Sequence, residues 1–312
     1  MQNAEFRRLL ASLERLTPRQ RRTLRAAIEP RQIDPEEQLP VPEVCIHCGG
    51  NQVIRWGRPR GKQRWRCKAC HRTFSRFTNT PREGLRHRER WAEFAAALLD
   101  GATVHQIAER CGIDPSTAHR WRTRFLEGLV AVQEPLEGIA EADETYLLRS
   151  AKGQPQEREA LDRPARKRGG KATRRGLSRE QVPILMVQDR SGAVASRVTD
   201  PFNAKAASAL LREVLAEDAI LCTDGHRSYR AAARELDFRH ERVVHSQGVR
   251  VRGPFHIQNA NNLHSRFKDW LRRFNGVSTS RLPLYVAWFN RIVQIEAEGD
   301  PREAALRKML EA

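Results

Sequence analysis

Apolar residues recur at two different spacings along the chain, and the change of spacing divides it into parts. Between residues 91 and 129 they recur every three or four positions, which is typical of helices with one buried face. From about residue 138 short apolar runs alternate with turns and helical stretches, as in a sheet covered by helices. The pattern predicts the order β-β-β-α-β-α-β-α for residues 138–295. The first of these helices is expected over residues 204–217, with Asn203 as its cap.

Three helices are predicted within residues 88–130, and their boundaries are marked by capping residues. Thr103 begins the second helix, and Asp114 caps the third, with Pro115 at its first position. This layout is that of a helix-turn-helix module, whose last helix enters the major groove of DNA with its N-terminal residues. On that face we expect DNA contacts from Ser116, Thr117, His119 and Arg120.

Four of the six cysteines form two pairs, Cys45-Ile-His-Cys48 and Cys67-Lys-Ala-Cys70, separated by eighteen residues. This spacing predicts a zinc ribbon over residues 44–80, in which four thiolates complete a closed, structural Zn²⁺ site. The alternatives are unrelated buried cysteines or a redox pair, but no thioredoxin-like pattern surrounds either pair. Basic residues follow the first pair closely, and we expect them to contact the DNA backbone: Arg58, Arg60, Lys62 and Arg64.

The two ends of the chain carry weaker signals. Residues 4–29 predict two short helices, and the proline-rich stretch 30–43 predicts a linker, so 1–43 forms one part. Residues 296–312 are predicted to be a C-terminal tail. No apolar run reaches the length of a membrane span, and the first residues lack the layout of a signal peptide. We therefore expect a cytoplasmic protein with no membrane partner.

The charge of the chain indicates what kind of partner the protein binds. The 312 residues hold 56 Lys and Arg against 38 Asp and Glu, giving a net charge of +18. The excess lies in two blocks, residues 45–90 and 146–181, on an otherwise neutral chain. Two local basic blocks indicate two places where nucleic-acid phosphates are neutralised, which favours a protein bound to the nucleoid. The second block, predicted as a loop insertion over 149–181, contains Arg166, Lys167 and Arg168.

The strand and helix order of residues 138–295 matches the RNase-H-like fold, an α/β fold with a mixed sheet. The first and fourth strands of that fold are parallel neighbours, which would bring Asp143 and Asp224 side by side. Two carboxylates in one cleft repel each other unless divalent cations lie between them. Two such ions can support an in-line phosphoryl transfer.

Three segments resemble the catalytic blocks of DDE-type transposases from bacterial insertion sequences: EADETY at 141–146, CTDGHRSY at 222–229 and HIQNANNLHSRFKDWLRRF at 256–274. The likeness is greatest to the group with an N-terminal zinc ribbon and an ISXO-like catalytic domain. It covers most of residues 1–295.

The resemblance implies catalytic roles for Asp143 and Asp224 as ligands of Mg²⁺ or Mn²⁺. The third position falls on Asn261, where the general pattern has glutamate. Some members of the group likewise have asparagine, followed seven residues later by lysine, and Lys268 matches that lysine. The alternatives are a helix-start role for Asn261 and a solvated Lys268. Glu144 is expected to point to the opposite face of its strand.

The function that these features predict is that of a transposase. It would bind the terminal inverted repeats of its element and cleave and transfer double-stranded DNA. Because two element ends must be cut together, we expect a homo-oligomer. The alternative is a DNA-binding regulator whose RNase-H-like domain is inactive, which Asn261 favours. A third hypothesis, an RNase H or a Holliday-junction nuclease, shares the fold but does not explain two DNA-binding modules ahead of it.

Overall fold

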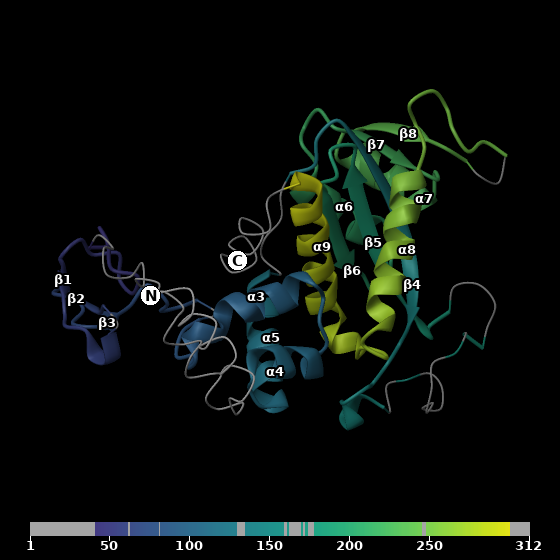
Figure 1. Cartoon of the computed structure of the whole chain (residues 1–312). Helices are drawn as coiled ribbons and strands as arrows, with labels where there is room; N and C mark the ends of the chain where they lie inside the picture. The colour runs from purple at the N-terminus through teal and green to yellow at the C-terminus, as the bar shows by residue number, and fades with distance from the viewer. Residues whose placement is uncertain are drawn as a thin grey trace, which may run out of the picture. The chain divides into compact units, whose positions relative to one another are not determined.

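The computed structural model describes residues 41–61, 63–80, 82–129, 135–158, 161, 170, 172–173, 178–244 and 248–299. The chain divides into two compact units, residues 1–83 and 84–312 (Figure 1). The helices predicted at 4–29 lie outside the described residues, as does most of the predicted linker.

The first unit contains a small antiparallel sheet beside the two cysteine pairs. Its strands are β1 (Val53–Arg55), β2 (Trp65–Cys67) and β3 (Thr73–Phe74), in that order. Trp65 is buried and packs against Phe74 in the core of this unit. Trp56 is instead 46% exposed, and the guanidinium of Arg66 lies 4.4 Å from its ring centre. Of the two tryptophans, Trp56 is therefore the one open to a partner.

Three helices open the second unit: α3 (Trp91–Leu99), α4 (Val104–Cys111) and α5 (Pro115–Leu129). Their boundaries follow the predicted capping residues. Thr103 forms a capping box with Gln106 at the start of α4, and Asp114 accepts the backbone N–H of Ser116 at 2.8 Å. Gly112 ends α4 with a φ of 58°, a left-handed conformation that allows the tight turn into α5.

A five-stranded mixed sheet follows, in the order β6-β5-β4-β7-β8. Strands β4, β5 and β6 pair antiparallel, whereas β7 pairs parallel to both β4 and β8. The first and fourth strands in chain order, β4 and β7, are thus parallel neighbours, as the RNase-H-like fold requires. The strands are β4 (Ile139–Leu148), β5 (Gln181–Asp189), β6 (Val194–Val198), β7 (Ile220–Thr223) and β8 (Arg239–Arg242).

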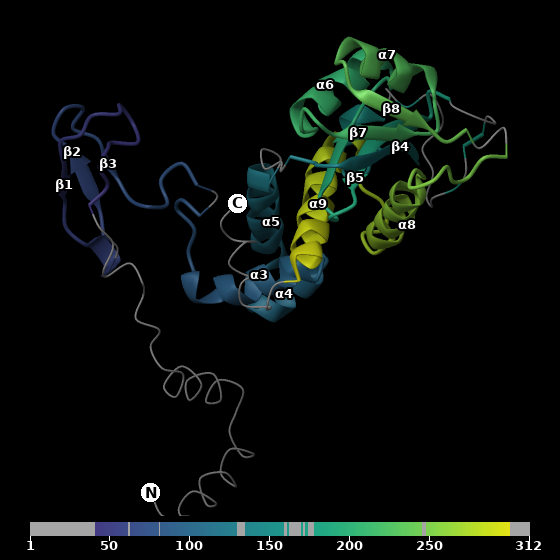
Figure 2. The same ribbon diagram turned by 90° about the horizontal axis from the view of Figure 1, so that it is seen from above.

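Helices cover both faces of this sheet (Figure 2). On one face lie α6 (Ala204–Val214) and α7 (Arg227–Glu235), and on the other lie α8 (Gln258–Arg272) and α9 (Leu282–Glu298). The main core is between the sheet and the α6/α7 pair, where Ala140, Ala142, Leu185, Leu210 and Tyr229 pack together. Because side chains alternate along a strand, Asp143 lies on the α8 side of β4.

The described elements differ from the predicted ones at their ends. Asn203 caps α6 as predicted, accepting the N–H of Ala206 at 2.9 Å. The helix predicted to reach residue 217 ends at Val214 because Leu215 is extended and pairs with Leu136 in a parallel bridge. A short tertiary pairing therefore ends the helix, and the local sequence does not signal it.

The helices α3 to α5 pack against the late helices of the same unit. The indole N–H of Trp288, on α9, donates to the carbonyl of Leu98, on α3, at 2.9 Å. Aromatic rings from α8, the segment just after it and α9 contact one another beside this point, and they belong to Phe267, Trp270, Phe274, Tyr285, Trp288 and Phe289. No helix within the described ranges combines the length and apolar character of a membrane span.

Candidate active site

Asp143 and Asp224 come from neighbouring parallel strands. In the register of β4 and β7, Glu141 is paired with Cys222. Two residues further along each strand, the same register sets Asp143 opposite Asp224, which directly follows β7. Their charges interact, since Asp224 raises the pKa of Asp143. The two aspartates singled out from the sequence are therefore side by side.

Each carboxylate is fixed through one oxygen. Asp143 Oδ1 accepts the backbone N–H of Glu144 at 2.9 Å, and Asp224 Oδ1 accepts that of His226 at 2.8 Å. Burial raises the pKa of Asp143 to about 7, and the charges of Glu144 and Asp224 act in the same direction. The protein thus holds a negative charge here in surroundings that disfavour it, as expected of a cation site.

The face of α8 that covers β4 is identified by His264. Its Nδ1 atom lies 3.9 Å from Asp143 Oδ2, and its side chain is 11% exposed. Asn261 is three residues before His264 and Lys268 four residues after it, so helical periodicity sets all three on one face. Asn261 and Lys268 are exposed along this face. The charge of Lys268 reaches Asp143, lowering its pKa in opposition to the effect of burial.

Glu141 holds the beginning of α8 against the sheet. Its side chain is fully buried, and it accepts the backbone N–H groups of Asn259 at 2.8 Å and Ala260 at 3.2 Å. Arg190 pairs with the same carboxylate at 2.8 Å, and His256 Nδ1 lies 3.2 Å from it. Negative charge at a helix N-terminus stabilises the helix. Glu141 therefore positions the turn of α8 that carries Asn261.

Glu144 faces away from this site, as its strand position predicts. It accepts hydrogen bonds from the hydroxyl of Tyr229, on α7, at 2.7 Å and from that of Tyr146 at 3.2 Å. Both contacts are on the α6/α7 side of the sheet. Its charge still reaches Asp143 and raises the pKa of that carboxyl. Glu144 therefore affects the charge state of Asp143 from the opposite face of β4.

The donor set fits a hard divalent cation. Magnesium and manganese ions prefer oxygen ligands, and Asp143 and Asp224 each keep one carboxylate oxygen that no described backbone N–H occupies. The Asn261 carboxamide offers a neutral oxygen from the adjoining helix. A cation between the two aspartates would offset both their repulsion and the burial of Asp143.

The four cysteines of the first unit form a second metal-binding cluster. Their Sγ atoms all lie within 4.8 Å of one another. The Cys45–Cys70 and Cys48–Cys67 pairs are each 3.7 Å apart, close to the sulfur spacing of about 3.8 Å that tetrahedral Zn–S bonds of about 2.3 Å require. The backbone N–H of Cys70 lowers the pKa of Cys67 to about 7, whereas the pKa of Cys48, 3.7 Å away, is raised by the neighbouring thiols and by burial. The cluster could bind zinc.

The residues expected to contact DNA differ in their surroundings. Ser116 and Arg120 are exposed at the start of α5, and Thr117 accepts a hydrogen bond from Arg120 at 3.3 Å. The Nε2 atom of His119 instead lies 2.7 Å from the guanidinium of Arg281, just before α9. On α5, Ser116 and Arg120 are thus the more open to a partner.

In the first unit, Arg58 donates to the side chain of Gln63 at 3.2 Å, and Arg64 donates to the hydroxyl of Thr73. The side chain of Arg60 is not described, and four of the predicted contacts lie outside the described residues: Lys62, Arg166, Lys167 and Arg168.

Sequence reasoning missed Glu141, Arg190 and His264. A signal for two of them was present. Strand alternation sets Glu141 on the same face as Asp143, and helical spacing sets His264 between Asn261 and Lys268. Arg190 gave no such signal, because it lies in the β5–β6 turn and reaches Glu141 only in the folded protein.

Residues 135–290 match the family of the ISXO2-like transposase domain, and residues 85–133 match that of the homeodomain-like domain. A protein described as an uncharacterized protein in transposable element ISH50, from Halobacterium salinarum, is 30% identical over 273 residues. The match covers 86% of this chain and 90% of that protein.

Two solved structures show a low similarity to this chain. The simian T-cell lymphotropic virus intasome, in complex with PP2A regulatory subunit B56 gamma, is 12% identical with a TM-score of 0.29, over 63% of this chain and 60% of that one. A pre-cleavage Mos1 transpososome is 13% identical with a TM-score of 0.23, over 73% and 81%. These scores are low, and the family assignment depends on the sequence matches alone.

Proposed function

Because the chain belongs to the ISXO2-like transposase family, we propose that it binds the terminal inverted repeats of its own insertion sequence and cleaves and transfers DNA strands. The observation that carries this proposal is the placement of Asp143, on β4, beside Asp224, at the end of the parallel neighbour β7, with α8 over Asp143. In a chain with a helix-turn-helix module, that arrangement supports chemistry on DNA phosphodiesters.

Four residues have proposed roles in the chemistry. Asp143 and Asp224 hold divalent metal, Mg²⁺ or Mn²⁺, and Asn261 adds a neutral oxygen ligand from α8. When bound, two such ions make water a stronger nucleophile and stabilise the leaving oxygen. Lys268, exposed one turn beyond His264, contacts a phosphate of the substrate strand. The charge of Lys268 would also limit the repulsion between that phosphate and the carboxylates.

The reaction has two phosphoryl transfers. In the first, a water oxygen attacks the phosphorus at the element end, the P–O3′ bond breaks, and a free 3′-hydroxyl remains. In the second, that hydroxyl attacks a phosphodiester of the target and releases a new 3′-hydroxyl there. Neither step needs a covalent link to the protein, so no Ser or Tyr nucleophile is assigned.

DNA binding is proposed for separate parts of the chain. Cys45, Cys48, Cys67 and Cys70 hold a structural Zn²⁺ that fixes the ribbon, from which Arg58, Arg60, Lys62 and Arg64 contact the backbone. Ser116, Thr117, His119 and Arg120 read the element end from α5. Arg166, Lys167 and Arg168 bind the substrate strand or the target. Because both ends must be cut together, the protein acts as a homo-oligomer on DNA, in the cytoplasm.

The test uses a supercoiled plasmid carrying the element ends, with the full-length protein and its zinc retained. Asp143→Ala and Asp224→Ala should each lower strand cleavage at least 1,000-fold, on the order of a lost metal ligand, and spare end binding. Asp269→Ala is the matched control, since Asp269 is exposed on α8 and pairs with Arg272. Cleavage by either variant near the wild-type rate would remove that aspartate from the active site.

A DNA-binding regulator is the second candidate, and Asn261 is the observation that favours it. A carboxamide carries no charge and holds a divalent cation more weakly than glutamate does. The regulator binds the repeats but does not nick them in Mg²⁺ or Mn²⁺. Preferential cleavage of RNA–DNA hybrids or four-way junctions would instead identify a nuclease of the same fold.

A further inference from the structure

A pocket of about 700 Å³ opens on the α6/α7 side of the sheet, the face opposite the one on which α8 lies. It is lined by the end of β4, the segment before α6 and the start of α7. The turn that carries Asp224 leads directly into it, since the N–H of His226, a lining residue, donates to Asp224 at 2.8 Å. One lining residue of the pocket, His226, is therefore only two positions along the chain from Asp224, a proposed metal ligand.

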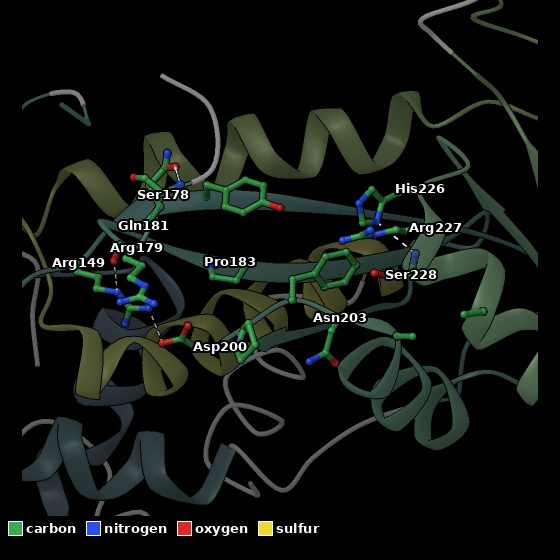
Figure 3. A pocket seen from close by; sticks show the side chains of 15 residues that line it. Arg149, Ser178, Arg179, Gln181, Pro183, Asp200, Asn203, His226, Arg227 and Ser228 are labelled. Carbon is green, nitrogen blue, oxygen red and sulfur yellow. Dashed lines mark hydrogen bonds and ion pairs between the residues drawn. The ribbon is translucent and has the colours of Figure 1, made fainter. Parts of the chain in front are cut away.

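Cationic side chains lie at both ends of the pocket. Figure 3 shows Arg149 and Arg179 at one end, His226 and Arg227 at the other, and Pro183 between them. Arg149 is held by Asp200 at 2.6 Å and by the carbonyl of Arg179 at 2.7 Å. The guanidinium groups of Arg179 and Arg227 make no ion pair with any described carboxylate. Positive charge is thus available at two separated points.

The middle of the pocket is apolar and aromatic. The ring of Phe202 packs against His226 at 5.7 Å and against the buried Tyr229 at 5.3 Å, which holds Phe202 in place at the pocket wall. Tyr146 also lines the pocket, with its hydroxyl bonded to Glu144 at 3.2 Å. A fixed aromatic wall between two cationic ends is the arrangement that binds single-stranded nucleic acid, in which bases stack on rings and phosphates follow the charges.

We propose that this pocket holds an unpaired segment of one DNA strand beside the phosphodiester that is cut. A base stacks on Phe202, and the phosphates on its two sides are neutralised by Arg227 and by Arg179. The volume is in the range of small-ligand pockets, which suits one or two nucleotides and not a double helix. Stacking on Phe202 offsets part of the cost of unpairing the strand near the cut.

This inference depends on the proposed function for its substrate, DNA. It goes further by assigning single-stranded deoxynucleotides to a pocket on the opposite face of the sheet from α8. It also gives Phe202, Arg179 and Arg227 roles in holding the substrate strand, apart from the metal ligands.

The experiment measures binding of a fluorescein-labelled thymidine hexanucleotide to the full-length protein by anisotropy, with zinc retained and no Mg²⁺ or Mn²⁺. Phe202→Leu, which removes the ring but keeps apolar volume, should weaken binding about tenfold. Arg227→Gln should lower the slope of log K against log salt by about 0.7, the value for one phosphate contact to a single strand.

Two matched variants control for effects on the fold. Phe238→Leu removes a ring that packs against the same core but does not line the pocket, and Arg234→Gln removes a charge from the exposed far end of α7. Both should bind the hexanucleotide as wild type does. Equal binding by Phe202→Leu and wild type, or equal losses in Phe202→Leu and Phe238→Leu, would overturn the proposal.

A crosslinking arm locates the strand directly. A hexanucleotide with one 5-iodouracil should crosslink on irradiation to the peptide that holds Phe202 or to the one that holds Tyr146. Crosslinks confined to the first unit or to α5 would overturn the proposal. Free thymidine monophosphate should compete at least tenfold less well per nucleotide than the hexanucleotide. Equal competition would indicate a mononucleotide pocket instead of a strand site.

The binding and crosslinking measurements do not require DNA cleavage. They can therefore contradict the strand pocket without contradicting the proposed transposase function. They are repeated with Asp143→Ala, which should retain the Phe202-dependent binding. Binding without any metal-dependent cleavage by the wild type would overturn the proposed function alone. Cleavage by the wild type together with unchanged binding and cleavage by Phe202→Leu would overturn the strand pocket alone.

Discussion

The imidazole Nδ1 of His264 on α8 lies 3.9 Å from the carboxylate Oδ2 of Asp143 on β4. Burial, together with the charge of Lys268, lowers the pKa of His264 to about 4, so the ring is neutral near pH 7. Its Nε2 is buried with no hydrogen-bond partner among the described residues. The ring is thus oriented on Asp143 by packing, and it marks the face of α8 that lies over the aspartates.

His264 is predicted to act as a positioning residue for Asp143. His264→Phe keeps a buried ring but removes both nitrogens, and it should lower the cleavage rate 10- to 100-fold, the usual effect of losing a group that orients a metal ligand. The rate is measured at several Mg²⁺ concentrations, and the apparent affinity for the ion should fall as well. An unchanged affinity and rate in a folded His264→Phe protein would show that the ring only packs.

Much of this site could be predicted from the sequence because strand signals are local. Asp224 directly follows an apolar run, and Asp143 lies in the segment 138–148 that the sequence pattern predicts as a strand, so strand order alone brings them together. The side chains that complete the site depend on how α8 lies across the sheet. Glu141 contacts Asn259 over more than a hundred residues of sequence, and no short pattern reports such a contact.

Contacts between residues far apart in the sequence also limit the prediction of the fold. Capping residues set the starts of α4, α5 and α6, and Thr103, Asp114 and Asn203 predict these starts correctly. The sequence pattern places the end of α6 three residues too late, because a pairing with Leu136 ends the helix. Capping residues in the local sequence predict where these helices begin. The end of α6 is harder to predict, because it depends on a contact with a distant part of the chain.

Removal of the ribbon metal is predicted to weaken end binding and to leave the second unit folded. The ribbon core contains only a few buried side chains besides its cysteines, so metal bonds supply much of its stability. Cys67→Ser should lose the bound zinc, as measured by atomic absorption. Its affinity for the element ends should fall at least tenfold. Cys111→Ala is the control, because Cys111 is a buried cysteine of α4 outside the cluster. Retention of zinc by Cys67→Ser would contradict the four-cysteine site.

His240 is predicted to make stability depend on pH. Its Nε2 lies 2.8 Å from the hydroxyl of Thr223, and burial, with the charges of Arg242 and Arg230, lowers its pKa to about 4 against the opposing charge of Asp224. The unfolded chain has the ordinary value of about 6.5 and binds the proton more readily. This contribution is therefore complete above pH 6.5 and is lost as the pH falls toward 4.

The measurement is urea unfolding at pH 7.5 and at pH 5. His240 should account for roughly 2 kcal/mol of the difference in unfolding free energy between them, and His240→Gln should remove that part. His105→Gln, at an exposed position of α4, is the control and should leave the difference unchanged. The same pH dependence in His240→Gln and wild type would show that other groups cause it.

The basic segment after β4 is predicted to serve strand transfer more than end binding. Replacing Arg166, Lys167 and Arg168 with glutamine removes three charges from the block of residues 146–181 and none from the ribbon. Strand transfer into a target plasmid should fall at least fivefold, with end binding within twofold of wild type. The salt slope of target binding should fall by up to roughly 0.9 for each DNA phosphate that is no longer neutralised. Equal losses in both activities would contradict this division of the charge.

Arg122, on α5, is predicted to stabilise the second unit through its volume and its hydrogen bond, and not through its charge. It is buried and donates to the hydroxyl of Tyr285 at 2.9 Å. Its guanidinium lies 5.5 to 5.8 Å from the ring centres of Phe274, Tyr285 and Trp288. Burial lowers its pKa, and no described carboxylate pairs with it.

Arg122→Ala should lower the free energy of unfolding by about 2–4 kcal/mol, because it leaves a cavity among the rings and an unpaired tyrosine hydroxyl. Arg122→Met fills the same space without a charge to desolvate, and it should unfold within about 1 kcal/mol of wild type or above it. Urea unfolding measures both, with Arg234→Met on the exposed side of α7 as the control. Equal losses in the two Arg122 variants would mean that the buried charge itself holds α5 against α9 and the segment that follows α8.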